Sequence, residues 1–60
     1  MWTVVYITQS FETADKIREL LENAEILVML RRVEENSDSY EILVPETEIE
    51  EAHNIILNFE

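Results

Sequence analysis

Residues 26–45 read ILVMLRRVEENSDSYEILVP, and the two apolar runs in this stretch decide the fold. The first run, 26–33, is continuous but short for a helix, which favours a strand buried on both faces. The polar segment 34–39 is rich in Asn, Ser and Asp, which form turns by bonding their own backbone. The second run, 39–44, predicts another strand that ends at Pro45. The short connection between the runs therefore predicts a hairpin.

The chain before this hairpin predicts a strand followed by a helix. Residues 2–8 are rich in β-branched and aromatic side chains and are few enough for a strand. Residues 11–23 form an amphipathic helical pattern, and Ser10 is placed to accept a hydrogen bond from the first free amides. Asn23 tolerates the left-handed conformation that commonly ends a helix. The apolar side chains recur at helical spacing: Phe11, Ala14, Ile17, Leu21 and Ala24.

The chain after the hairpin predicts a second helix over 47–58. Thr47 and Glu50 have the spacing of a capping box at its start. The resulting order, β-α-β-β-α, places the third strand between the first and the second, with both helices on one face of the sheet. This is an α+β, ferredoxin-like half-sandwich without its fourth strand, and we expect residues 1–60 to form a single domain. One helix face continues the apolar pattern: Ile49, Ala52, His53, Ile56 and Phe59.

Acidic residues dominate the charge of the chain, with 14 Asp and Glu against 4 Lys and Arg and a formal net charge of -10. The sequence has no basic stripe that could displace counterions from phosphates, which argues against nucleic acid and anionic membranes as partners. No apolar stretch is long enough to span a bilayer. The chain begins directly on an apolar run, which predicts no export signal and a cytoplasmic location.

Glycine and cysteine are both absent from the sequence, and several kinds of chemistry are excluded with them. Without glycine, the chain cannot form a phosphate-cradling loop, a dinucleotide fingerprint, a nucleophile elbow or a calcium loop. Without cysteine it has no disulfide and no thiolate metal site, and a single histidine does not build a zinc cage. We therefore predict a protein that is not an enzyme and has no catalytic residue, no cofactor and no metal.

Self-association is the expected source of additional stability. A single core of this size rarely stabilises a fold by more than about 3 to 5 kcal/mol. The missing fourth strand would leave strand 2–8 as an apolar free edge, and two helices cover only one face of a sheet. We expect a homodimer, either edge to edge through strand 2–8 or face to face through the open sheet. The candidate association surface comprises Thr3, Val5, Ile7, Leu27, Met29 and Leu43.

Arg31, Arg32 and His53 are candidates for binding a small ligand. The two arginines are adjacent in a strand, so their side chains point to opposite faces and cannot clamp one ligand together. Salt bridges to the many carboxylates are one use for them, and an anion or carboxylate ligand at one of them is the alternative. His53 follows Glu50 at a Glu-x-x-His spacing. We interpret it as a boundary residue on the apolar helix face, with a metal site at a dimer interface as the alternative.

Five segments carry a resemblance to a known family: WTVVYI at 2–7, ADKIRELLE at 14–22, ILVMLR at 26–31, YEILVP at 40–45 and EA at 51–52. With these segments the chain resembles the prokaryotic signal-transducing protein family, small bacterial domains with a ferredoxin-like or ACT-like half. Such relatives usually have a glycine where the first helix turns into the second strand, and Ala24 or Glu25 stands there in this chain.

The resemblance implies a small regulatory or interaction module, and it assigns no catalytic residue to this chain. Together with the expected homodimer, it predicts a cytoplasmic, non-enzymatic module that recognises an unidentified protein partner. The alternative is an ACT-like sensor that binds a small amino-acid-like ligand at the dimer interface.

Overall fold

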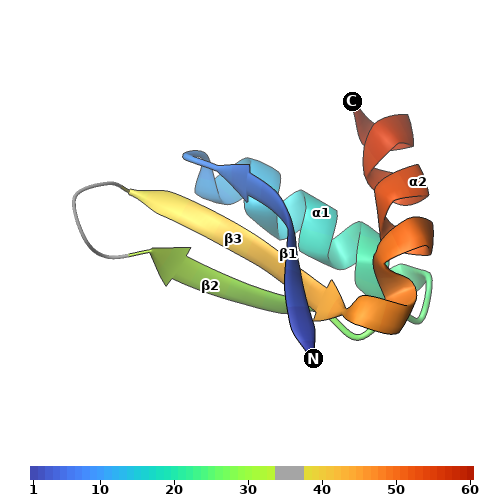
Figure 1. The fold of residues 1–60 in the computed structure, drawn as a ribbon. Helices are drawn as coiled ribbons and strands as arrows, with labels where there is room; N and C mark the ends of the chain where they lie inside the picture. Colours follow the sequence, from blue (N-terminus) through green and yellow to red (C-terminus); the bar gives the residue numbers. More distant parts are fainter. Residues whose placement is uncertain (34–37) are drawn as a thin grey trace.

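The strands and helices follow the predicted order β-α-β-β-α in a computed structural model that describes residues 1–33 and 38–60 (Figure 1). Residues 34–37 of the predicted turn lie outside the described residues. The elements are β1 (Trp2–Thr8), α1 (Phe11–Asn23), β2 (Met29–Val33), β3 (Ser39–Pro45), the short 3-10 helix η1 (Glu46–Glu48) and α2 (Ile49–Phe59).

The sheet has the predicted strand order, β1-β3-β2. β3 lies in the middle and runs antiparallel to both of its neighbours, so β1 and β2 run parallel to each other. Two parallel strands need a crossover connection, which α1 provides. The arrangement is an α+β fold that corresponds to a ferredoxin-like half, and it leaves β1 at one edge of the sheet.

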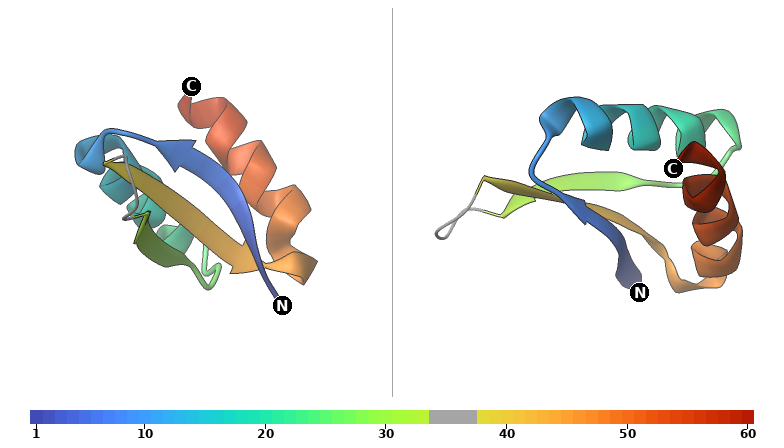
Figure 2. Two further views of the ribbon diagram at one scale, coloured as in Figure 1. Left: turned by 60° about the vertical axis from the view of Figure 1, so that its left-hand side comes forward. Right: turned by 90° about the horizontal axis from the view of Figure 1, so that it is seen from above.

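Both helices pack against the same face of the sheet. Ile42 and Val44 of β3 are fully buried and form one cluster with side chains of α1 and α2. Seen from above, α1 lies along one side of the strands, and α2 stands at the end where β3 leads into it (Figure 2). Within the described residues, neither helix is long and apolar enough to cross a membrane. The helices contribute these buried side chains: Ala14, Ile17, Leu21, Ala52 and Ile56.

The start of α1 is as predicted. Ser10 has an extended backbone, and its side-chain oxygen accepts a hydrogen bond from the Thr13 amide at 3.2 Å. This bond satisfies one of the amide groups that the first turn of a helix leaves without a partner. The arrangement also directs the chain from β1 into the helix within two residues, Gln9 and Ser10.

α1 ends at Asn23 as predicted, but Glu25 and not Asn23 takes the left-handed conformation, with φ at 65°. The Glu25 amide donates to the Glu22 carbonyl at 2.9 Å, and the Ile26 amide donates to the Leu21 carbonyl at 3.0 Å. These two bonds form a Schellman motif, in which the left-handed residue is usually glycine. A glutamate therefore occupies a backbone position that glycine adopts at lower cost.

The boundaries of β2 and α2 were predicted slightly wrongly, and local hydrogen bonding explains both. The Ile26 amide is used in the helix stop, so β2 begins at Met29 and not at residue 26. Pro45 has φ at -60°, and the chain turns directly into η1, which places Thr47 inside a helical turn. An N-cap residue needs an extended backbone, so the predicted capping box is wrong and α2 begins at Ile49 without a side-chain cap.

Candidate interaction surface

One face of the sheet lies opposite the helices. Because side chains alternate along a strand, the residues next to the buried Ile42 and Val44 point away from the helices. Residues directly opposite each other on neighbouring strands share a face. The register therefore sets two rows across the open face, namely Val4, Leu43 and Met29 in one row and Ile7, Glu41 and Arg31 in the next.

A β-bulge in β1 changes which of its side chains reach this open face. Val4 is opposite Leu43 and Tyr6 is opposite Ile42, so Val5 is an extra residue in β1. Val5 and Tyr6 both pack against the helix-covered core. The bulge thus places Val4 and Ile7 on the same face, although they are an odd number of residues apart.

Two residues of the predicted association surface do not lie on the open face. Thr3 is opposite the core residue Val44, and Val5 packs against the core. Simple alternation puts them on one face with Ile7, and the bulge breaks that alternation. Trp2 and Val4 take their place, and no sequence signal in 2–8 marks the bulge, because every residue of the strand suits either face.

We call the apolar side chains of the open face the open-face patch. Leu27 belongs to it because its neighbours Ile26 and Val28 both pack on the core, which turns Leu27 to the other side. Ile7 is 59% exposed and Leu27 is 69% exposed, so the patch presents large apolar surface to solvent. Its members are Trp2, Val4, Ile7, Leu27, Met29 and Leu43.

Leu43 is the centre of the patch and is itself only 4% exposed. It lies on the central strand between Val4 and Met29, so side chains of both neighbouring strands shield it although no helix covers this face. It is absent from the core cluster on the helix side. Leu43 therefore holds the centre of the patch, and the exposed contact area comes from the residues around it.

Arg31 and Glu41 are the charged residues among those rows, and they pair with each other. The Arg31 Nη2 and Nε atoms donate to the same oxygen, Glu41 Oε1, at 2.6 Å and 2.9 Å. Arg32 is opposite Tyr40 on β3, and its Nη2 atom donates to Asp38 at 3.1 Å. The predicted salt bridges of both arginines are confirmed, and the two guanidinium groups belong to opposite faces of the sheet.

His53 is exposed on α2, and this corrects its predicted place on the apolar face of the helix. The buried side of α2 is formed by Ala52 and Ile56, and His53 lies one residue further around the helix than Ala52. Among residues 1–33 and 38–60, no three His, Asp or Glu side chains gather into a group that could hold a metal ion.

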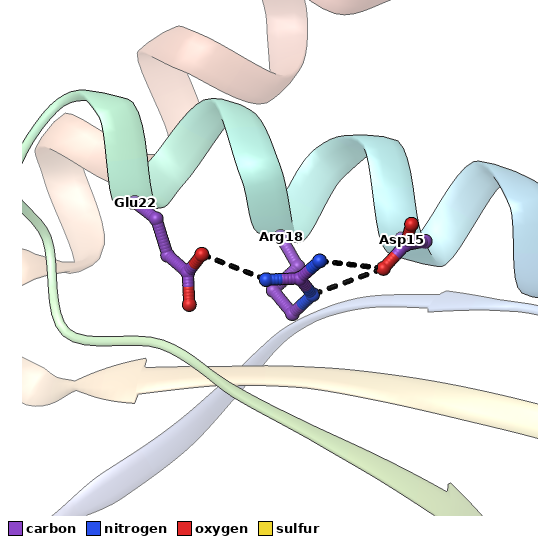
Figure 3. A network of polar contacts seen from close by, with 3 residues as sticks. All are labelled: Asp15, Arg18 and Glu22. Atoms are coloured by element: carbon purple, nitrogen blue, oxygen red, sulfur yellow. Dashed lines mark hydrogen bonds and ion pairs between the residues drawn. The ribbon is translucent and has the colours of Figure 1, made fainter.

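Both helices carry exposed acidic residues. Arg18 on α1 binds Asp15 and Glu22, each at 2.7 Å (Figure 3). The hydrogen bonds that Arg18 donates to Asp15, together with the charges of both carboxylates, raise the pKa of Arg18. Exposed carboxylates on the two helices include Glu12, Glu19, Glu22, Glu50 and Glu51. The open face, in contrast, carries a single internally neutralised pair within its two rows.

Comparison of the chain with protein-family models, with curated proteins and with solved structures finds no match. The resemblance to the prokaryotic signal-transducing protein family stays a prediction.

Proposed function

We propose that this chain is a small, non-enzymatic regulatory or interaction module of the cytoplasm that forms a homodimer face to face through the open-face patch. The absence of cysteine suits a reducing compartment, and the absence of glycine argues against phosphate-binding and nucleophile loops. The function of such a module is to present a dimeric surface to a partner protein.

The lack of net charge on the apolar open face is the observation that carries this proposal. Two copies of a chain with a net charge of -10 repel each other, so they associate best where neither copy is charged. The open-face patch is apolar, and the Arg31–Glu41 pair beside it has no net charge. A face-to-face dimer buries this surface and leaves the carboxylates of the helices in solvent.

The bulge in β1 favours the face over the edge as the interface. A second strand adds to a free edge most easily when that edge is long and flat. The extra residue Val5 interrupts the regular spacing of β1 near its middle and bends the strand, which Figure 1 shows as a curved ribbon. Of the two alternatives, edge to edge and face to face, we therefore choose the second.

The dimensions of the molecule are sufficient for such a dimer. The Cα atoms span 30 × 24 × 15 Å, so the molecule is flat. A stable interface buries about 1,200 Å² or more, or about 600 Å² per protomer. That area is roughly a seventh of the accessible surface of 4254 Å².

Sedimentation equilibrium tests the proposal directly. The native chain is expected to sediment as a dimer at micromolar concentration. Met29→Glu places a carboxylate in the patch, so it should weaken the dimer roughly hundredfold, because each interface contains the change twice. Leu57→Glu is the matched control, because Leu57 is 68% exposed on α2 and the substitution changes the net charge equally.

Circular dichroism establishes that each variant is folded. A monomeric native chain at high micromolar concentration would contradict the proposal. So would a Leu57→Glu chain that dissociates as readily as Met29→Glu, since the effect would then follow from charge alone.

A further inference from the structure

The Arg31–Glu41 pair leaves hydrogen-bonding capacity unused on the open face. Both guanidinium contacts go to one carboxylate oxygen, Oε1. Within the described residues, Glu41 Oε2 accepts no hydrogen bond and Arg31 Nη1 donates none. Water can reach both atoms in a monomer, because the Arg31 side chain is 55% exposed and the described residues contain no buried side-chain nitrogen or oxygen without a partner.

Burial of the open face in a dimer removes that water. An ion pair taken out of solvent is tolerated only where its remaining donors and acceptors find new partners. Apart from the indole N–H of Trp2, the side chains of the open-face patch offer neither donors nor strong acceptors. The group that a second copy brings to the same face is its own Arg31–Glu41 pair.

We propose that the Arg31–Glu41 pairs of the two protomers bond to each other across the two-fold axis and so fix how the copies are aligned. Nη1 of each Arg31 donates to Oε2 of the partner's Glu41, which joins four charges into one neutral cluster. The two-fold axis therefore passes close to this row of the sheet. Burial of the apolar patch favours association but does not fix the relative orientation of the two copies, whereas the charged row does. This inference rests on the proposed homodimer.

Mixing two charge-reversal variants tests the inference. R31E leaves two carboxylates in the row, and E41R leaves two guanidinium groups, so each variant should self-associate more weakly than the native chain. In a mixture, the two rows face each other with opposite charge. Native mass spectrometry should then show the heterodimer at about tenfold or more above its statistical proportion.

The ion pair of Arg18 and Glu22 on α1 provides a matched control. R18E and E22R change the net charge of the chain by the same amounts, but on the helical surface away from the open-face patch. A mixture of these two variants should give heterodimers at the statistical proportion only. The double variant R31E/E41R, in which the pair is reversed but kept, should dimerise like the native chain.

The outcomes separate this inference from the proposed function. If the native chain dimerises and Met29→Glu dissociates it, but the R31E and E41R mixture stays statistical, the pair acts only within one protomer and this inference is wrong. If the native chain is a monomer, both proposals are wrong. Circular dichroism of each variant before mixing ensures that a missing heterodimer does not reflect an unfolded protomer.

Discussion

The two faces of the sheet are built from the same three strands and have opposite surroundings. On one face, Ile42 and Val44 are fully buried under α1 and α2. On the other face, Leu43 is shielded only by its neighbours, and Ile7 and Met29 remain exposed. The strands supply apolar side chains to both faces, but the chain contains enough helix to cover one.

This difference assigns the two faces to different tasks: the helix-covered face stabilises the protomer, and the open face is available for recognition. Residues under the helices contribute packing within one protomer, where a lost methylene leaves a cavity. Residues on the open face keep their apolar area available for a second chain. The following predictions test that division, from the largest expected effect to the smallest. Stability is measured in the Met29→Glu background, so that folding is separated from dimerisation.

The strongest contrast is between Ile42 and Ile7. Ile42→Ala removes a fully buried side chain at the centre of the core and should lower the free energy of unfolding by about 3 kcal/mol. Ile7→Ala changes a side chain that is 59% exposed and should lower it by less than about 0.5 kcal/mol. Urea denaturation followed by circular dichroism measures both. Equal effects would mean that the open face also belongs to the folding core.

Leu43 sharpens the comparison because it is buried on the open face. Leu43→Ala should lower the free energy of unfolding by about 2 kcal/mol, less than Ile42→Ala, because water and the flanking Val4 can occupy part of the space. The same urea titration gives the value. A cost above that of Ile42→Ala would show that the centre of the open face is as tightly packed as the helix-covered side.

A glycine at position 25, in the turn between α1 and β2, should stabilise the fold. Glu25→Gly relieves a left-handed backbone at φ 65° and should raise the free energy of unfolding by about 1 kcal/mol. Glu25→Ala is the control, because it removes the same charge without relieving the backbone. Asn23→Gly should have the opposite sign, since Asn23 is helical. Thermal denaturation ranks the three variants.

Added salt should stabilise the fold by screening the repulsion among its carboxylates. With a net charge of -10, self-repulsion among the carboxylates weakens the compact state, and added ions screen it over a Debye length of about 10 Å at 0.1 M. Sodium chloride should therefore raise the melting temperature by a few degrees. An unchanged or lower melting temperature would indicate that the arginine pairs compensate the acids more fully than we infer.

The smallest effect concerns Tyr6, on the helix-covered face. Burial raises the pKa of the Tyr6 hydroxyl above 10.0, and the Glu60 carboxylate raises it further. The unfolded chain then loses this proton at lower pH than the folded chain, so the associated stability is present below about pH 10 and is lost above it. Tyr6→Phe should show a shallower loss of stability between about pH 9 and pH 11 in urea titrations. If the native and Tyr6→Phe chains lost the same free energy of unfolding over this pH range, the assignment to Tyr6 would be wrong.

Much of the fold could be predicted because its signals are local. The strand over 2–8, the helix over 11–23 and the N-cap at Ser10 have the predicted positions. The predicted β3 is one residue short, because Pro45 still pairs with Trp2. Element boundaries were predicted wrongly where a neighbouring turn uses a residue that the sequence pattern assigns to a strand or a helix cap. The Ile26 amide bonds to the end of α1 and not within β2, and Thr47 lies inside η1 and not at the N-cap of α2.

The interaction surface was predicted less well than the fold. Ile7, Leu27, Met29 and Leu43 lie on the open face, whereas Thr3 and Val5 belong to the helix side. The burial of Leu43 and the exposure of the face around it depend on three strands meeting, which a pattern within one strand does not describe. His53 was misplaced because a single step along a helix separates its buried side from its exposed side.

The amino-acid sequence by itself determined the elements, their order and the charge, because apolar periodicity, caps and breakers act over a few residues. Only the tertiary structure decided which side chains of β1 face outward. The bulge at Val5 arises from the pairing of β1 with β3, a contact between residues some forty positions apart, and one extra residue reverses every side chain beyond it.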